Sequence, residues 1–294
     1  MLNKLLSLMT MAMLVVLASG LLASPVVAAD RPEGAVENSK AFNDAVKSGD
    51  AAWQAQDFDR AIYHYVQAMN NSPHDAATLA KIGTIEDGRG HSDLAEKAFF
   101  LAHEAAPEEP RIAERLARLY LRRGNLNGAG AIYGEVLLRD ATRTRALDGM
   151  GEVFLGRAEY AESIRCFDRA LQAQTPDSAA VLTHRGQARL HLKDLTGAEA
   201  DFRAALAVEP REDTWRYLGD AQVLQGRTGA ALGSLLNVMD TSQAYNEIGV
   251  TLLNVKNYQS AREYFAKAIS ASAAWFEEAQ RNLALADEQL RDAG

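Results

Sequence analysis

One short segment carries four arginines at helical spacing: Arg111, Arg115, Arg118 and Arg122. At about 100° per residue, a helix gathers these four side chains within about 60° of its surface. Small and apolar residues fall on the opposite side, where a helix would pack: Ala113, Leu116, Ala117 and Tyr120. Guanidinium groups bind carboxylates through two parallel hydrogen bonds. The segment is therefore a candidate site for an acidic peptide or a chain terminus.

The competing interpretation is a solvated charged face that binds nothing. Like charges one turn apart on a helix repel by about 0.2–0.5 kcal/mol per pair. Within the same segment only Glu114 offers relief. This repulsion favours a binding role, but both interpretations stay open.

Little else in the chain predicts chemistry. It contains no Gly-rich phosphate loop, HExxH zinc motif, paired-cysteine site or nucleophile elbow. His184 and His191 share a helical face, but two imidazoles without a third ligand make a poor metal site. The lone Cys166 precedes an expected core residue, Phe167, and is expected to be an inert, half-buried thiol. We therefore predict no catalytic residue, no cofactor and no metal.

A repeat organises the chain. A small residue returns at intervals of 34, 34, 34, 35, 33 and 30 residues: Gly49, Gly83, Ala117, Gly151, Gly186, Gly219 and Gly249. A ring or Leu lies sixteen residues after each: Tyr65, Phe99, Tyr133, Phe167, Phe202, Leu235 and Phe265. The pattern indicates two short helices that pack closely at the small residue, with the large side chain beside them. Each pair has too little apolar surface to fold alone, so neighbouring pairs must stack.

The pattern resembles the tetratricopeptide repeat (TPR) family, which has a 34-residue period with small, aromatic and proline positions. Prolines lie near the end of the frame at Pro73, Pro107 and Pro210. The resemblance implies an all-α TPR solenoid, a right-handed superhelix of seven helix-turn-helix repeats over residues 42–275. Repeat six, 212–241, is four residues short. Residues 276–294 are expected to form a C-terminal capping helix, with an apolar stripe at Phe276, Ala279, Leu283, Ala286 and Leu290.

The resemblance also implies where a ligand would bind. In TPR proteins five positions of the first helix tend to line a concave groove, and Arg111, Arg118 and Arg122 occupy three of them. Arg145, at the second place of repeat four, would lie beside them. Apolar groove residues offer an alternative contact surface: Leu121, Leu155 and Leu190.

Some TPR proteins hold a C-terminal carboxylate with a Lys/Asn clamp spread over three repeats. Arg111 and Arg115 resemble the basic pair that this clamp has in its third repeat. Val46 and Asp50 of repeat one and Lys81 of repeat two depart from the clamp pattern. The departure leaves an acidic segment and a chain terminus as alternative ligands.

Residues 1–29 have the features of a cleaved signal peptide. A positive residue precedes a long apolar stretch, and Val27-x-Ala29 has the small-residue form of a signal-peptidase site. The alternative is an uncleaved inner-membrane anchor, because the apolar stretch approaches the length that a ~30 Å hydrocarbon core requires. Residues 30–41 are polar and are expected to form a flexible lead. The segment predicts a periplasmic or otherwise exported protein that does not stay inserted in a membrane after cleavage.

The charge balance limits the class of partner. The chain has 31 basic and 39 acidic residues, and loss of Lys4 with a signal peptide would change the net charge from −8 to −9. An acidic chain does not favour binding to nucleic acid or to an anionic membrane through its net charge. The sequence leaves the oligomeric state open.

Two functions agree with these observations. The first is a non-catalytic protein-protein interaction adaptor in the cell envelope that binds a partner segment in its groove. The runs 244–249, 261–265 and 279–283 resemble the end of TPR proteins associated with tight-adherence (Flp) pilus assembly, which implies pilus or secretion-system assembly. The alternative is an accessory TPR subunit of an enzyme complex, such as a polysaccharide synthesis or export machine, in which the arginines would meet an anionic polymer.

Overall fold

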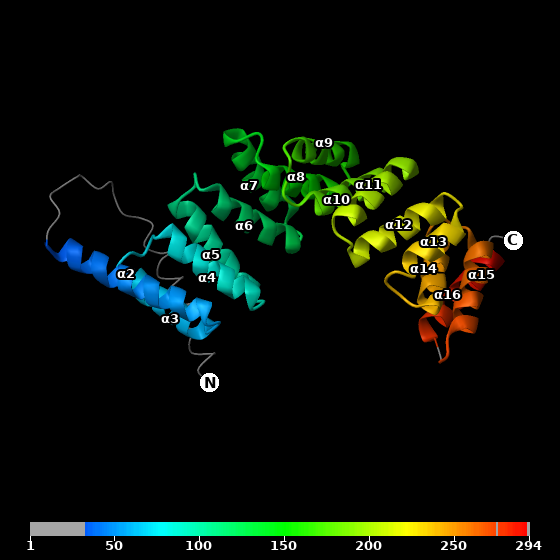
Figure 1. Cartoon of the computed structure of the whole chain (residues 1–294), viewed down its shortest axis with the longest axis horizontal. Coiled ribbons are helices and arrows are strands. Elements are labelled where there is room, and N and C mark those ends of the chain that lie inside the picture. The colour runs from blue at the N-terminus through cyan, green and yellow to red at the C-terminus, as the bar shows by residue number, and fades with distance from the viewer. Residues whose placement is uncertain (1–32, 275, 293–294) are drawn as a thin grey trace. The chain divides into compact units, whose positions relative to one another are not determined.

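The described part of the chain is built of helices. The computed structural model describes residues 33–274 and 276–292, which form fifteen α-helices and no β-strand. The signal peptide predicted at 1–29 lies outside these residues. The chain divides into two compact units, one ending at Ala141 and the other beginning at Thr142. Figure 1 labels the helices of both units.

The first unit contains six helices: α2 (Glu33–Gln54), α3 (Phe58–Met69), α4 (Ala76–Gly88), α5 (Ser92–Ala105), α6 (Pro110–Arg122) and α7 (Leu126–Arg139). The second unit contains nine: α8 (Thr144–Gly156), α9 (Tyr160–Gln172), α10 (Ser178–His191), α11 (Leu195–Val208), α12 (Glu212–Leu224), α13 (Thr228–Leu235), α14 (Thr241–Asn254), α15 (Tyr258–Ala271) and α16 (Glu277–Asp292). A turn of three residues joins the two helices of every pair from α2–α3 to α14–α15. The predicted all-α fold of seven helix pairs and a terminal helix is confirmed. No helix of this described part combines the length and the apolarity that a membrane span needs.

The small and large residues of the repeat pack directly against each other, as predicted. The rings at this place are almost wholly buried: Tyr65, Phe99, Tyr133, Phe167, Phe202 and Phe265. A Cβ atom at Gly186 would lie 2.5 Å from the Phe202 ring, closer than Cβ atoms approach a neighbour. The other glycines at this place meet their partners in the same way. Absence of a side chain therefore lets the two helices of a pair approach.

Each turn inside a repeat contains one residue with positive φ. Glycine occupies this place in three repeats: Gly90, Gly124 and Gly226. Other residues adopt the same left-handed conformation in four repeats: Gln56, Ala158, Lys193 and Lys256. That conformation costs a non-glycine residue about 1 kcal/mol, because its Cβ approaches the following carbonyl oxygen. The turn geometry is thus kept even where the residue type does not favour it.

Two helices differ in length from the 34-residue frame. α2 begins at Glu33, so residues 33–41 are helical where a flexible lead was expected. After Gly34 this stretch contains neither Gly nor Pro, so nothing in it stops a helix. α13 has 8 residues, whereas the second helices of the other repeats have between 12 and 14. Repeat six is therefore shorter than the 34-residue frame because its second helix is short.

The terminal helix α16 packs against α14 and α15. Ala279 and Ala286 of the predicted apolar stripe are buried, and Leu283 packs against the core of the last repeats. Arg262 of α15 forms an ion pair of 2.6 Å with Asp287 of α16. α16 therefore covers the apolar face that the last repeat would otherwise expose.

Candidate binding surfaces

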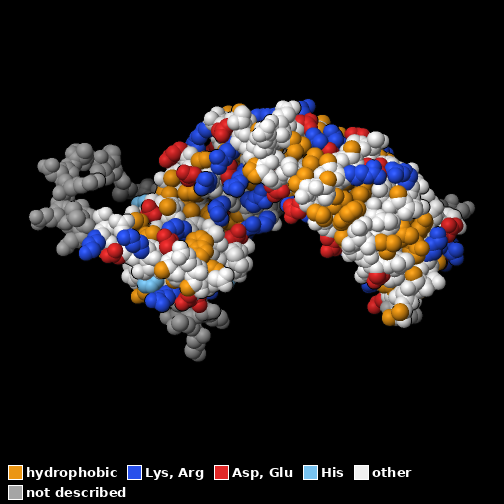
Figure 2. Space-filling model, in the orientation of Figure 1, with side chains coloured by type: hydrophobic (Ala, Val, Ile, Leu, Met, Phe, Trp, Pro, Cys, Tyr) orange, Lys and Arg blue, Asp and Glu red, His pale blue; other side chains and the backbone are white. Residues whose placement is uncertain are grey.

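The four predicted arginines lie on the exposed side of α6. The Glu109 carboxylate accepts a hydrogen bond from the backbone N–H of Arg111, and Pro110 occupies the first turn, so the helix starts just before the arginines. Apolar residues of the same helix are buried: Ile112, Ala113, Leu116, Ala117 and Leu119. All four arginines are exposed, and Figure 2 shows Lys and Arg side chains gathered over the region of α6. We call this surface the arginine face.

Two members of the arginine face contact α4 of the preceding repeat. Arg122 forms an ion pair with Asp87, and Arg115 Nη1 donates a hydrogen bond of 3.1 Å to Thr84 Oγ1. The Arg111 guanidinium has no hydrogen bond or ion pair with any residue that the structure describes. Glu114, the residue expected to relieve the repulsion among these arginines, is buried. Asp87 was missed since it lies 35 residues from Arg122 and only the folded repeats bring the two together.

The remaining predicted groove residues lie in both units. Leu121 is half-buried on α6, Leu155 is half-buried on α8, and Arg145 is exposed near the start of α8. Since α8 belongs to the second unit, the expectation that Arg145 lies beside the arginine face stays a prediction. Leu190 is half-buried on α10 and lines a cavity of about 700 Å³.

Two of the residues that depart from the carboxylate clamp, Asp50 and Lys81, form an ion pair with each other. Lys81 Nζ lies 2.6 Å from Asp50 Oδ1, and the Tyr65 hydroxyl donates a hydrogen bond of 2.6 Å to the same oxygen. Burial opposes ionisation of Asp50, but these two hydrogen bonds outweigh it and lower its pKa. Burial and the adjacent Asp50 carboxylate raise the pKa of Tyr65. This place in repeats one and two therefore holds an internal ion pair where the clamp has Lys and Asn.

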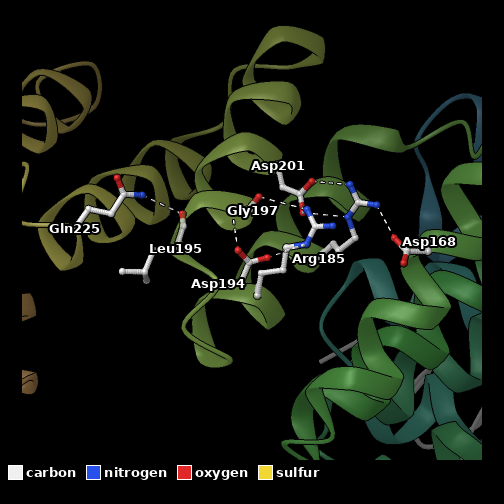
Figure 3. Close-up of polar contacts among 8 residues, drawn as sticks. Asp168, Arg185, Asp194, Leu195, Gly197, Asp201 and Gln225 are labelled. Carbon is white, nitrogen blue, oxygen red and sulfur yellow. Dashed lines mark hydrogen bonds and ion pairs between the residues drawn. The ribbon is translucent and has the colours of Figure 1, made fainter.

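A network of ion pairs that the sequence analysis did not single out joins α9, α10 and α11 (Figure 3). Arg185 of α10 lies 2.6 Å from Asp168 and 2.6 Å from Asp201, and Arg189 lies 2.7 Å from the second oxygen of Asp201. Burial works against the charge of Arg185, yet its hydrogen bonds to both aspartates raise its pKa. Asp201 is 4% exposed, so these arginines neutralise a buried charge. The network therefore stabilises the repeats and offers little to a ligand.

A second buried carboxylate, Glu199 of α11, has partners from the next repeat. Arg227 Nη1 lies 2.8 Å from Glu199 Oε1, and Gln225 Nε2 donates a hydrogen bond of 3.0 Å to Glu199 Oε2. Burial raises the pKa of Glu199, but its hydrogen bonds with Gln225, Gln222 and Arg227 outweigh this effect and the net shift is downward. Both networks connect residues more than ten positions apart, which explains why a search for local motifs missed them.

The predicted histidine pair does not form one site. The His191 ring stacks on Tyr160 with centroids 4.6 Å apart, while His184 Nδ1 lies 3.4 Å from Asp148 Oδ1. Asp148, Glu152 and His184 place one potential ligand atom each within 4.8 Å of one another. These are donor types that a divalent cation accepts. The cluster therefore contains one of the two histidines, His184, with two acidic residues of α8.

The environment of the single cysteine agrees with an inert thiol. Cys166 is 7% exposed, and burial raises the pKa of its thiol. A protonated, buried thiol is a poor nucleophile. This side chain is more buried than the half-buried state expected from the sequence.

Comparisons with known proteins identify the repeats. Residues 149–213 and 242–274 match family models described as tetratricopeptide repeat. The chain contains tetratricopeptide repeats. A curated mouse protein described as FK506-binding protein-like is 31% identical over 173 residues, a match covering 55% of this chain and 47% of that protein. The chain thus matches about half the length of this relative.

Solved structures extend the likeness of fold beyond these segments. A TPR protein from Parabacteroides merdae has a TM-score of 0.64 and 20% identity, and the match covers 84% of this chain and 99% of that one. PilF of Pseudomonas aeruginosa has a TM-score of 0.55 and 16% identity over 71% of this chain and 97% of its own. YrrB, described as a TPR protein with an unusual peptide-binding site, has a TM-score of 0.51 and 23% identity over 67% of this chain and 100% of its own. At these identities the likeness shows a helical TPR fold, and that fold suggests a scaffold for protein-protein interaction that is typically non-catalytic.

Proposed function

We propose that this protein is a non-catalytic adaptor that binds an acidic segment of a partner protein at the arginine face. The observation that carries the proposal is the hydrogen-bonding capacity of this face. The Arg111 guanidinium forms no hydrogen bond or ion pair with a described residue, and the Arg115 guanidinium donates only to the hydroxyl group of Thr84. A guanidinium offers five N–H donors, so much of this capacity remains available to carboxylates of a ligand.

The surroundings of the arginine face support an acidic ligand. All four arginines are exposed on one side of a helix that is 13 residues long, in a chain whose acidic residues outnumber its basic ones by 39 to 31. A local positive patch attracts acidic partners even on a protein whose net charge is negative. A free C-terminal carboxylate and an acidic side chain are the two forms that such a ligand can take.

The test is charge reversal where no ion pair is lost. Changing both Arg111→Glu and Arg115→Glu should weaken partner binding at least tenfold, because an attractive site becomes repulsive. Wild-type affinity should also fall as salt rises from 50 to 500 mM. The matched control reverses Lys47 and Lys97, two exposed cations of the same unit that lie outside α6.

Partners captured by the wild-type protein would be identified by mass spectrometry, and their affinities measured by calorimetry. Equal affinity of the wild type and the α6 variant for every partner would refute the arginine face as the binding site. A loss that the Lys47 and Lys97 control reproduces would also refute it, because net charge alone would then explain the effect.

We place this adaptor in the cell envelope, in an assembly such as a pilus or secretion system. The support is the signal-like segment 1–29 and the closing runs of the sequence. Fusing residues 1–35 to a reporter that is active only outside the cytoplasm should give activity, and the mature chain should start at Asp30. An intact Met1 terminus in the membrane fraction would favour the anchor instead.

A further inference from the structure

A cavity of about 700 Å³ opens along the turns of repeats five, six and seven, all within the second unit. Its walls come from the last turns of α10, α12 and α14 and the first turns of α11, α13 and α15. Apolar side chains dominate it: Leu190, Val223, Leu224, Leu252, Val255 and Tyr264. Figure 2 shows hydrophobic side chains on the surface over α10 and α12. We call this place the turn cavity.

The apolar lining of the turn cavity has a buried floor and an exposed wall. Val223 and Leu252 are 3% and 7% exposed and form part of the core, while Val255 is 51% exposed. At Gly226, between them in the lining, a Cβ atom would meet nothing within 4 Å. Because glycine has no side chain, the cavity stays open at repeat six, the middle one of its three repeats.

The charged side chains at the turn cavity are positive. None of the thirteen residues that line it is acidic, and Lys193 is one of them. Lys256 stands between two lining residues, Val255 and Asn257, and both lysines are exposed. The acidic residues next to the cavity are engaged, because Asp194 caps α11 and Glu199 pairs with Arg227. Three helices end here and three begin, so the partial charges of their termini oppose one another, and the positive charge at the cavity comes from its side chains.

The two lysines occupy strained positions. Lys193 and Lys256 have φ values of 63° and 61°, at the place in the turn where three other repeats have glycine. The left-handed conformation favours glycine over lysine at these two places. Lys193 lines the cavity in repeat five, and Lys256 lies beside two lining residues in repeat seven, so a segment with a carboxylate at each end has a lysine near both.

We propose that the turn cavity binds a short segment of a partner protein in which large apolar side chains are flanked by carboxylates. The apolar side chains would cover the exposed wall at Val255 and Leu224, and the carboxylates would pair with Lys193 and Lys256. An aliphatic or aromatic anchor distinguishes this ligand from the purely acidic segment proposed for the arginine face. The turn cavity is thus a second binding surface, and it does not depend on the first.

The experiment selects ligands from a random library of 12-residue peptides displayed on phage, with the full chain as the target. Enriched peptides are then labelled, and their affinities are measured by fluorescence anisotropy. We expect sequences with adjacent large apolar residues flanked by Asp or Glu. Val255→Asp should weaken their binding at least tenfold, since it places a carboxylate on the exposed wall, and Lys193→Glu with Lys256→Glu should do the same.

Two control variants separate this cavity from other surfaces. Val208→Asp changes another exposed valine, on α11 outside the cavity and 60% exposed, and should leave binding unchanged. The α6 variant Arg111→Glu with Arg115→Glu should also leave it unchanged, so the two binding surfaces can fail independently. A thermal unfolding midpoint equal to that of the wild type would show that the fold of each variant is intact.

Three results would overturn the proposal. Enriched peptides could lack acidic flanks or apolar anchors, or they could bind the Val255→Asp variant as tightly as the wild type. The third result concerns laurate, a fatty acid with one acyl chain and one carboxylate, whose binding is measured in the same way. If laurate binds in the turn cavity and no peptide does, the cavity is a lipid site and the peptide assignment is wrong.

Discussion

Asp220 provides a quantitative test of how repeats six and seven are joined. It lies half-buried on α12, and Thr251 of α14 donates a hydrogen bond of 2.6 Å to its Oδ1. Burial raises the pKa of Asp220 from 3.8 to about 6, against the lowering effect of the Thr251 hydrogen bond. Glu247 of α14 raises it further, while Arg216 of α12 lowers it. The charged form is thus disfavoured in the folded protein.

The sign of the effect follows from proton linkage. The folded state binds the Asp220 proton more tightly than the unfolded state, so this group stabilises the fold fully below pH ~4, and the contribution is lost as pH rises through about 6. Each pKa unit corresponds to about 1.4 kcal/mol, so the complete loss approaches about 3 kcal/mol. Because the side chain is only half-buried, water screens part of this energy, and we expect about 1–3 kcal/mol.

The perturbation is Asp220→Asn, which removes the charge and keeps an acceptor oxygen for Thr251. Urea unfolding at pH 4.5 and pH 7.5 should show that the variant gains about 1–3 kcal/mol relative to the wild type between these two pH values. Glu288→Gln, at an exposed acid of α16, is the control and should show no such gain. A difference between variant and wild type that is independent of pH would refute this account of Asp220.

Two further predictions concern the backbone of the repeat. Gly186→Leu should lower the free energy of unfolding by about 3 kcal/mol or more, because its Cβ would lie 2.5 Å from the buried Phe202 ring. Gly233→Ala, where a Cβ meets nothing within 4 Å, should instead be neutral or stabilise by up to about 1 kcal/mol; equal thermal midpoints for both variants would contradict the assigned packing. Gly124→Ala should destabilise by about 1 kcal/mol, because φ is +74° there. Gly88→Ala, a helical glycine with open space around it, is its control in urea unfolding, and a Gly124→Ala variant as stable as Gly88→Ala would contradict the strain.

The fold could be predicted because its determinants recur at fixed places and act over short distances. The contact of Gly186 with Phe202 spans sixteen residues and is repeated with small changes in every pair. A pattern that occurs seven times averages out the irregularity of any one repeat, such as the Ala117 that replaces glycine. The start of α2 was missed because it belongs to no repeat, and only local helix preference governs it.

The binding surfaces were harder to predict because their contacts join different repeats. The side of α6 that carries the arginines follows from helical periodicity, but the pairing of Arg122 with Asp87 depends on how α4 lies against its neighbour. The turn cavity has no sequence signature, since its lining combines separate turns. Lys193 and Lys256 are two of the four residues other than glycine at the turn position that glycine holds in three repeats. Only an alignment of the seven turns brings these two lysines to the same place in the repeat.

The two groups of arginines in this chain show how one residue type takes two roles. Arg185 is 17% exposed and reaches two aspartates that the fold itself provides, so removal of its charge would leave the buried Asp201 with Arg189 as its remaining arginine partner. The arginines of α6 are exposed, and Arg111 and Arg115 meet no carboxylate among the described residues. The supply of internal carboxylates therefore decides the role: where the repeats provide it, the arginine holds the helices together, and where they do not, its donors face the solvent and can recognise an acidic partner.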